Sequence, residues 1–205
     1  MLSRTAARLR GISLIELMVA LILAGILMAL AAPSFSAWMQ NTRIRSTAES
    51  IQTGIQFAKS EATSRNTRVR FQLTTSVDSS CALSSSGTSW VVDVVDADDG
   101  SDSVAGQCNA APSDTVAPSI LVTRAASDGQ GTTLVQSSVD SLVFNGLGRL
   151  VPTPANNITI LVSNTGAGGC IDAGGDLTCL RVIISPAGQV RMCNPRFSQP
   201  DPQAC

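Results

Sequence analysis

Apolar residues form one unbroken run near the start of the chain. Residues 12–32 read ISLIELMVALILAGILMALAA, with Glu16 as the only charged residue among them. A helix of this length rises about 31 Å at about 1.5 Å per residue, enough to cross a hydrocarbon core about 30 Å thick. The short segment before it is basic, with Arg4, Arg8 and Arg10. We therefore expect that segment to stay in the cytoplasm and the rest of the chain to lie outside.

Beyond this run, apolar positions recur at helical spacing. Charged and amide side chains occupy the positions between them, which predicts an amphipathic helix ending near residues 64–66. A coiled coil would give the same spacing, but the small Ala residues in the stripe favour packing onto a sheet. The stripe consists of Ile44, Ala48, Ile51, Ile55, Ala58 and Ala62.

The apolar pattern then changes to a period of two. Val69, Phe71 and Leu73 alternate with polar residues, which predicts a half-buried strand. Gly and Pro at 146–148 and 186–188 predict two tight turns of the hairpin kind. Further strands are expected at 90–95, 120–124, 133–136, 141–145, 158–163, 180–185 and 189–192.

These elements predict an α+β fold, in which one long N-terminal helix packs on a β-rich C-terminal domain of antiparallel sheets. The expected division of the chain is a leader at 1–11, a membrane-spanning helix half at 12–32, an amphipathic half at 33–66 and a globular domain at 67–205.

All six cysteines lie beyond the apolar run. An even count in the part that would be exported predicts disulfides formed in an oxidising compartment. Metal binding is poorly supported, because the chain has no CxxC pair and no His. Proximity in sequence favours Cys81–Cys108. It also favours some arrangement of the other four that ties down the C-terminus, and a bond between the second and third of these is one option. These four are Cys170, Cys179, Cys193 and Cys205.

Charge and composition narrow the function classes. Fourteen basic side chains, three of them in residues 1–11, stand against fifteen acidic ones. A chain without that segment has a side-chain charge of −4, so bulk charge does not indicate a polyanion-binding protein. The absence of His, and of any nucleophile elbow or phosphate-binding loop, argues against an enzyme, and no cofactor is expected.

An acidic run lies between two of the predicted strands. Its spacing is like that of a calcium loop, but no Glu closes it, so a hydrated acidic turn is favoured over a calcium site. The run contains Asp93, Asp96, Asp98, Asp99 and Asp102.

Glu16 is unusual because it lies inside the apolar run. A carboxylate in a membrane helix costs about 2.5–3.5 kcal/mol unless it has a partner or lies near the interface. The run has no Lys or Arg, so the natural partner is a free α-amino group on another subunit. Signal-peptide cleavage near Pro33 would remove the whole helix, but a proline after the cut is unfavourable. Cleavage between Gly11 and Ile12 would keep the helix.

The segment 11–18, GISLIELM, resembles the class III signal of type IV prepilins and type II secretion pseudopilins. The resemblance implies that a prepilin peptidase cuts after Gly11 and methylates the new amine of Ile12. It implies that Glu16 pairs with that amine on a neighbouring subunit, which would favour one axial offset between subunits. Pro33 would then be the twenty-second mature residue, where proline is common in the family.

The same resemblance implies partners and a location. The partners are other pilins or pseudopilins, the prepilin peptidase, the inner-membrane assembly platform and, before assembly, the lipid bilayer. The location is the bacterial inner membrane, with the C-terminal domain in the periplasm, and afterwards a pilus or pseudopilus.

A narrower resemblance lies in the second half of the chain. VFNGLGR at 143–149 and LRVIISPAGQVRMCNP at 180–195 resemble the FimT/FimU group of minor pilins and the H-type pseudopilin of type II secretion. That group places two sheets after the long helix. The function predicted first is a minor pilin, a structural or priming subunit of a type IV pilus. The H-type pseudopilin is the alternative.

DNA binding is a further alternative. Some FimT-like members bind DNA through a GRxR motif, and here Gln189 replaces the first arginine of that motif. The candidate DNA contacts are Arg181, Arg191 and Arg196, although arginines on a solvent-facing strand are the favoured interpretation.

Overall fold

One helix dominates the N-terminal part of the protein. The computed structural model describes residues 13–95, 104–126, 132–165 and 169–205, without the side chains of residues 31–33. Helix α1 runs from Leu14 to Arg65, a length of 52 residues. The chain divides into two compact units, Met1–Trp38 and Met39–Cys205, so α1 contributes to both. Each unit is described by itself below.

Helix α1 ends where the sequence predicted, through a left-handed residue. Asn66 has φ 51°. Its N–H donates to the carbonyl of Thr63, and the N–H of Thr67 donates to the carbonyl of Ala62. This pair of hydrogen bonds is the Schellman motif, which satisfies carbonyls left over at a helix C-terminus.

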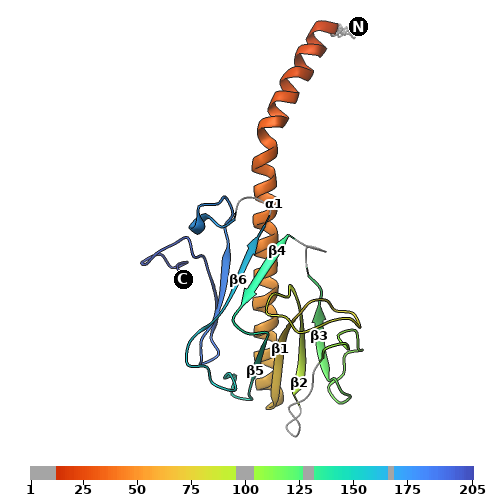
Figure 1. Cartoon of the computed structure of the whole chain (residues 1–205), viewed down its shortest axis with the longest axis vertical. Coiled ribbons are helices and arrows are strands. Elements are labelled where there is room, and N and C mark those ends of the chain that lie inside the picture. Colours follow the sequence, from red (N-terminus) through yellow and green to blue (C-terminus); the bar gives the residue numbers. More distant parts are fainter. Residues whose placement is uncertain (1–12, 96–103, 127–131, 166–168) are drawn as a thin grey trace, which may run out of the picture. The chain divides into compact units, whose positions relative to one another are not determined.

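The strands form two antiparallel four-stranded sheets (Figure 1). Every predicted strand is present, with bounds within one residue of the prediction. The first sheet has the order β3-β2-β1-β5, and its strands are β1 (Arg68–Thr74), β2 (Ser89–Val95), β3 (Ile120–Arg124) and β5 (Ser141–Phe144). The second sheet has the order β4-β6-β7-β8, and its strands are β4 (Thr133–Ser137), β6 (Ile158–Asn164), β7 (Leu180–Ile184) and β8 (Val190–Cys193). A 3₁₀ turn at Ile171–Ala173 precedes β7.

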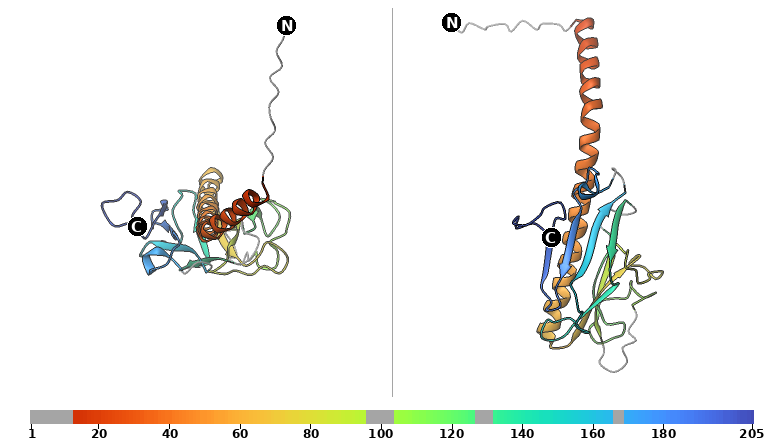
Figure 2. Two further views of the ribbon diagram at one scale, coloured as in Figure 1. Left: turned by 90° about the horizontal axis from the view of Figure 1, so that it is seen from above. Right: turned by 60° about the vertical axis from the view of Figure 1, so that its left-hand side comes forward.

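Both sheets pack on the second half of α1, which lies along them in Figure 2. The six stripe positions predicted from Ile44 to Ala62 are all 0% exposed. They share one core cluster with Phe71 and Trp90 of the first sheet and Val182 of the second. The sequence-based expectation of packing onto a sheet is therefore confirmed, and the helix is the layer on which the two sheets meet.

The helix approaches the first sheet most closely at Gly54. A Cβ atom there would lie 2.8 Å from Cε2 of Phe71 and 2.9 Å from Cε2 of Trp90. The Trp90 ring is held in place, since its Nε1–H donates to Oγ of Ser50 at 3.0 Å. Glycine is required here because there is no room for a side chain between helix and sheet.

The prediction of a half-buried β1 is wrong. Gln72, expected on the polar face, is fully buried, and so is Asp93 on the neighbouring strand β2. A second core cluster around the Cys81–Cys108 disulfide lies on this face of the sheet through Val91. Polar side chains therefore lie between two layers, and they pair with one another.

Asp93 is the acceptor at the centre of that buried pairing. Its carboxylate binds Nη2 of Arg70 at 2.6 Å and accepts from Nε2 of Gln72 at 2.9 Å. Asp93 thus belongs to the sheet and not to the acidic turn. The remaining acidic positions, Asp96, Asp98, Asp99 and Asp102, lie outside the described residues. Within the described part of the chain, no group of three or more His, Cys, Asp or Glu is arranged to hold a metal ion.

Three disulfides staple the globular unit. The structure forms the pair that sequence proximity favoured first, and it pairs the remaining four cysteines within two local loops, so the alternative Cys179–Cys193 bond is not formed. The last bond closes a C-terminal loop that also contains a bridge between Asn194 and Ala204; this loop lies beside the second sheet in Figure 2. The pairs are Cys81–Cys108, Cys170–Cys179 and Cys193–Cys205.

Candidate functional site

The first half of α1 presents an apolar surface on all sides. None of its large apolar side chains is buried within the chain, and the helix passes the length and composition criteria for a membrane span. An apolar surface of this extent marks a membrane or protein interaction site. The exposed residues are Leu14, Ile15, Leu17, Met18, Val19, Leu21, Ile22, Leu23, Ile26, Leu27, Met28, Leu30, Phe35 and Trp38.

Glu16 lies in the first turn of this surface, and it has a local role that the sequence analysis missed. The Glu16 N–H donates to Oγ of Ser13 at 3.2 Å, and the Leu17 N–H donates to the Ser13 carbonyl at 3.1 Å. Ser13 is thus the N-cap of α1, and Glu16 occupies the third helical position, the place of the acid in a capping box. The spacing Ser-x-x-Glu was the signal that could have found this pair.

A carboxylate in the first turn also interacts favourably with the helix dipole. The exposed carboxylate of Glu16 can therefore help to start the helix and still be available to a cation on another molecule. Gly11 and Ile12, the predicted processing residues, lie outside the described residues. Pro33 lies within α1, and its side chain is not described.

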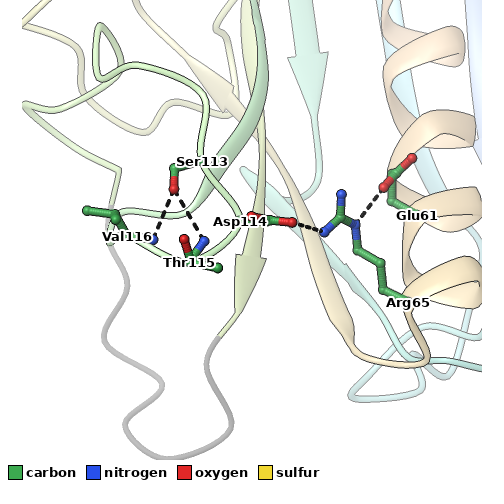
Figure 3. Close-up of polar contacts among 6 residues, drawn as sticks. All are labelled: Glu61, Arg65, Ser113, Asp114, Thr115 and Val116. Atoms are coloured by element: carbon green, nitrogen blue, oxygen red, sulfur yellow. Dashed lines mark hydrogen bonds and ion pairs between the residues drawn. The ribbon is translucent and has the colours of Figure 1, made fainter.

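The far end of α1 carries a second polar cluster (Figure 3). Nε of Arg65 donates to Oε2 of Glu61 at 2.7 Å, and Nη1 donates to Oδ2 of Asp114 at 2.9 Å. The hydrogen bond to Glu61 is the largest cause that raises the pKa of Arg65, and the hydrogen bond to Asp114 is the next. The same Arg65–Asp114 hydrogen bond is the main cause that lowers the pKa of Asp114. The cluster ties the helix end to the loop before β3. Its side chains are well exposed, so its role is to position that loop.

The two predicted turns meet beside Lys59, the only Lys in the sequence. Its Nζ donates to the Gly188 carbonyl at 2.8 Å. Gly188 has φ 78°, and its Cα lies so close to the Gly148 carbonyl that a Cβ would clash. Lys59 also lines an open groove of about 580 Å³ with Arg191, between α1 and the β7–β8 hairpin. Among the nine residues lining the groove, these two are the charged ones and both are basic.

The predicted DNA-contact arginines have different environments. Arg181 and Arg191 lie on neighbouring strands of the second sheet, opposite Cys193 and Ile183 respectively. Arg191 holds the C-terminal loop, since Nη1 donates to the Ala204 carbonyl at 3.3 Å and Nη2 to that of Cys205 at 3.1 Å.

Arg196 lies within the C-terminal loop, with its guanidinium 6.0 Å from the centre of the Phe197 ring. The described contacts thus show that Arg191 stabilises the C-terminal loop. They do not bring Arg181, Arg191 and Arg196 together around one shared contact.

A long helix that is apolar and exposed at its start, followed by a disulfide-stapled domain of two sheets, defines the class of pilin-like subunits. Residues 7–32 match the motif described as the prokaryotic N-terminal methylation motif. Residues 47–188, more than half of the chain, match the family described as type II transport protein GspH. The chain belongs to the GspH family.

Comparison with solved structures gives the same fold. The chain is similar to the type IV minor pilin FimU of Pseudomonas aeruginosa, with a TM-score of 0.50 and 19% identity over 78% of this chain and 97% of that one. A second crystal form of FimU gives a TM-score of 0.48 and 20% identity over 74% and 97% of the two chains. At this level of identity the likeness concerns the fold alone. No curated protein matches the chain.

Family membership establishes the general role. The protein is a structural subunit of the pilin and pseudopilin class and not an enzyme. The family implies processing by a prepilin peptidase and assembly with other pilins. The apolar helix indicates anchoring in the inner membrane before assembly.

Proposed function

We propose that this chain is a minor pilin of a type IV pilus, stored in the inner membrane and assembled through the first half of α1. The observation that carries the proposal is the exposed apolar surface from Leu14 onward, with Glu16 as its single charge. Such a surface is stable in lipid or against other apolar helices, but not in water. The subunit therefore moves from bilayer to filament without exposing it.

The carboxylate gives this transfer a defined register. After cleavage behind Gly11, the α-amino group of Ile12 carries the positive charge nearest to the apolar run. A Glu16 carboxylate buried in a filament without a cation would be strongly destabilising. Only the axial offset that places it against the Ile12 amine of a neighbour removes this penalty. The carboxylate thus selects one stacking of subunits.

Processing is tested by intact-mass and N-terminal analysis of the protein extracted from membranes. The expected product begins at Ile12, lacks residues 1–11 and carries one methyl group on the new amine. A product that retains the leader, or one cut after the apolar run, would contradict the proposal.

A second candidate is the H-type minor pseudopilin of a type II secretion system, which the family description over residues 47–188 favours. The two candidates share the N-terminal machinery and differ in the fibre that they enter. Deletion of the gene distinguishes them: loss of twitching motility supports the pilin, and loss of exoprotein secretion with normal twitching supports the pseudopilin. The fold likeness to FimU, a type IV minor pilin, leads us to place the pilus first.

A further inference from the structure

A pair of aromatic rings follows the apolar run on α1. Phe35 and Trp38 are 60% and 62% exposed, and their ring centroids lie 5.9 Å apart with 30° between the ring planes. Their spacing of three residues places both rings on one side of the helix. Large aromatic side chains so exposed on a helix indicate a surface with a partner.

We infer that this ring pair is an interfacial anchor, which binds the headgroup boundary of the outer leaflet while the subunit waits in the bilayer. The inference rests on the membrane-stored state in the proposed function. It adds the depth at which helix α1 rests in the bilayer, and the residues that set this depth.

The first argument is length. If residues 12–32 fill the hydrocarbon core, Phe35 lies about 4.5 Å and Trp38 about 9 Å further along the helix axis. Each interfacial zone of a bilayer is about 5–8 Å thick, because the whole bilayer measures about 40–45 Å and its core about 30 Å. Phe35 thus falls inside this zone, and the Trp38 backbone lies just beyond its outer limit.

The second argument is direction. Side chains on a helix lean toward its N-terminus, which here is the side of the bilayer. The rings of Trp38 and Phe35 lie close together, with 5.9 Å between their centroids, and Phe35 is about one turn closer to the apolar run. A lean toward the N-terminus brings the Trp38 ring back toward the interfacial zone, the level where amphipathic aromatic side chains collect in membrane proteins.

The third argument is that no charged residue near this end of the apolar run could fix the depth of the helix in the bilayer. No Lys, Arg, Asp or Glu occurs between Glu16 and Arg43. The polar boundary after residue 32 consists of small or uncharged residues, which would fix the depth of the helix weakly. The ring pair is the feature of this stretch that prefers the interface over both lipid core and water.

The chain supplies its own probe, because it contains two Trp residues. Trp90 is 4% exposed in the core of the globular unit and bound to Ser50, so lipid does not reach it. The full-length protein would be placed in phosphatidylcholine vesicles whose chains carry bromine near the headgroup, at mid-chain or at the terminal methyl. Subtracting the emission of Trp38→Phe from that of the wild type isolates Trp38 without altering the core, and Trp90→Phe gives an independent check.

The expected result is that the Trp38 emission loses most of its intensity with the shallow bromines and least with the deep ones. The Trp38→Phe protein, which reports Trp90 alone, should show no loss with any lipid. Flotation of the vesicles shows separately whether the chain is inserted. Protein that floats without quenching of Trp38, or with deepest quenching at the terminal methyl, overturns the anchor and leaves membrane storage standing. Protein that does not float contradicts membrane storage, and with it the anchor.

Discussion

The two halves of α1 are one helix in two different surroundings. Within residues 14–38 the described large apolar side chains are exposed on every side of the helix, whereas residues 39–65 bury one apolar stripe and expose polar side chains on the other faces. Both halves belong to one continuous α-helix, so helix formation does not distinguish them. What differs is the partner, because the second half finds two sheets within its own unit and the first half must find its partner in lipid or in another subunit.

The difference teaches where each kind of change should act. A substitution in the second half changes the free energy of unfolding of the globular unit. A substitution in the first half leaves that unit intact and changes insertion or assembly. The predictions below follow this division, from the largest expected effect to the smallest.

The largest effect is expected at Glu16, on assembly alone. Glu16→Ala and Glu16→Gln should be processed after Gly11, yet enter filaments at least on the order of a hundredfold less, because a neutral side chain cannot pair with the α-amine of a neighbour and breaking a buried pair costs about 3–5 kcal/mol. Immunoblots of sheared filaments measure incorporation, and circular dichroism checks that the globular unit melts unchanged.

Ser13→Ala is the matched control for this prediction. It removes the N-cap, at a cost of about 1 kcal/mol to the helix, but keeps the charge of Glu16. Near-normal incorporation of Ser13→Ala is expected. If it is as defective as Glu16→Gln, capping and not charge pairing explains the role of Glu16.

The next largest difference is expected when an isoleucine is truncated to alanine in each half of α1. Ile55 is 0% exposed, so Ile55→Ala should lower the free energy of unfolding by about 2–5 kcal/mol. Ile22→Ala makes the same chemical change on the exposed half and should alter it by less than about 0.5 kcal/mol. Denaturant unfolding in detergent micelles, followed by the fluorescence of Trp90 in a Trp38→Phe background, measures both. Equal losses would mean that the halves are not independent.

Glycine substitutions should differ in sign. Gly54→Ala places a methyl group against Phe71 and Trp90 and should destabilise the globular unit by about 1–3 kcal/mol. Gly25→Ala meets no atom within 4 Å and should raise helix stability by up to about 1 kcal/mol. Thermal melts by circular dichroism record both in the same micelles. A stabilising Gly54→Ala would show that the helix can move away from the sheet.

The smallest effect is expected at the end of α1, and it depends on pH. The pKa of Asp114 is lowered in the folded chain, chiefly by the hydrogen bond from Arg65. The contribution of the Asp114 carboxylate to stability is therefore fully present above the pKa of an unfolded Asp, about 3.9. It is lost as the pH falls through the lower pKa that Asp114 has in the folded chain. Asp114→Asn should melt slightly below wild type at neutral pH and coincide with it in acid. Added salt should shrink the difference, whereas a difference that grows in acid would contradict this contact.

Much of the fold could be predicted from the sequence because its signals are local. The stripe from Ile44 to Ala62 follows the helical repeat, and the alternation around Phe71 follows the strand repeat. The turn ending at Gly188 needs a positive φ, which glycine supplies at no steric cost. The same is true of the membrane segment and Glu16, since length, hydropathy and a misplaced charge require no knowledge of distant contacts.

Burial on the outer face of the first sheet was decided by tertiary structure. Gln72 was predicted on a polar strand face, and Asp93 was placed both in the strand 90–95 and in the acidic run; both side chains are fully buried. The sequence of a strand alternates between apolar and polar residues whether its polar face is covered by water or by another layer of the protein. Here the layer is built around the Cys81–Cys108 disulfide, and its members Val104 and Cys108 come from beyond β2 in the chain.

The sequence by itself thus determined the elements, their order and the one apolar helix half that needs a partner outside the chain. Tertiary structure decided which cysteines pair, that Lys59 binds the turn at Gly188, and that Arg191 holds the C-terminal loop. The physical reason is the range of the interactions. Periodicity and turn chemistry act between residues a few positions apart, whereas burial and pairing depend on which distant segments the folded chain brings together.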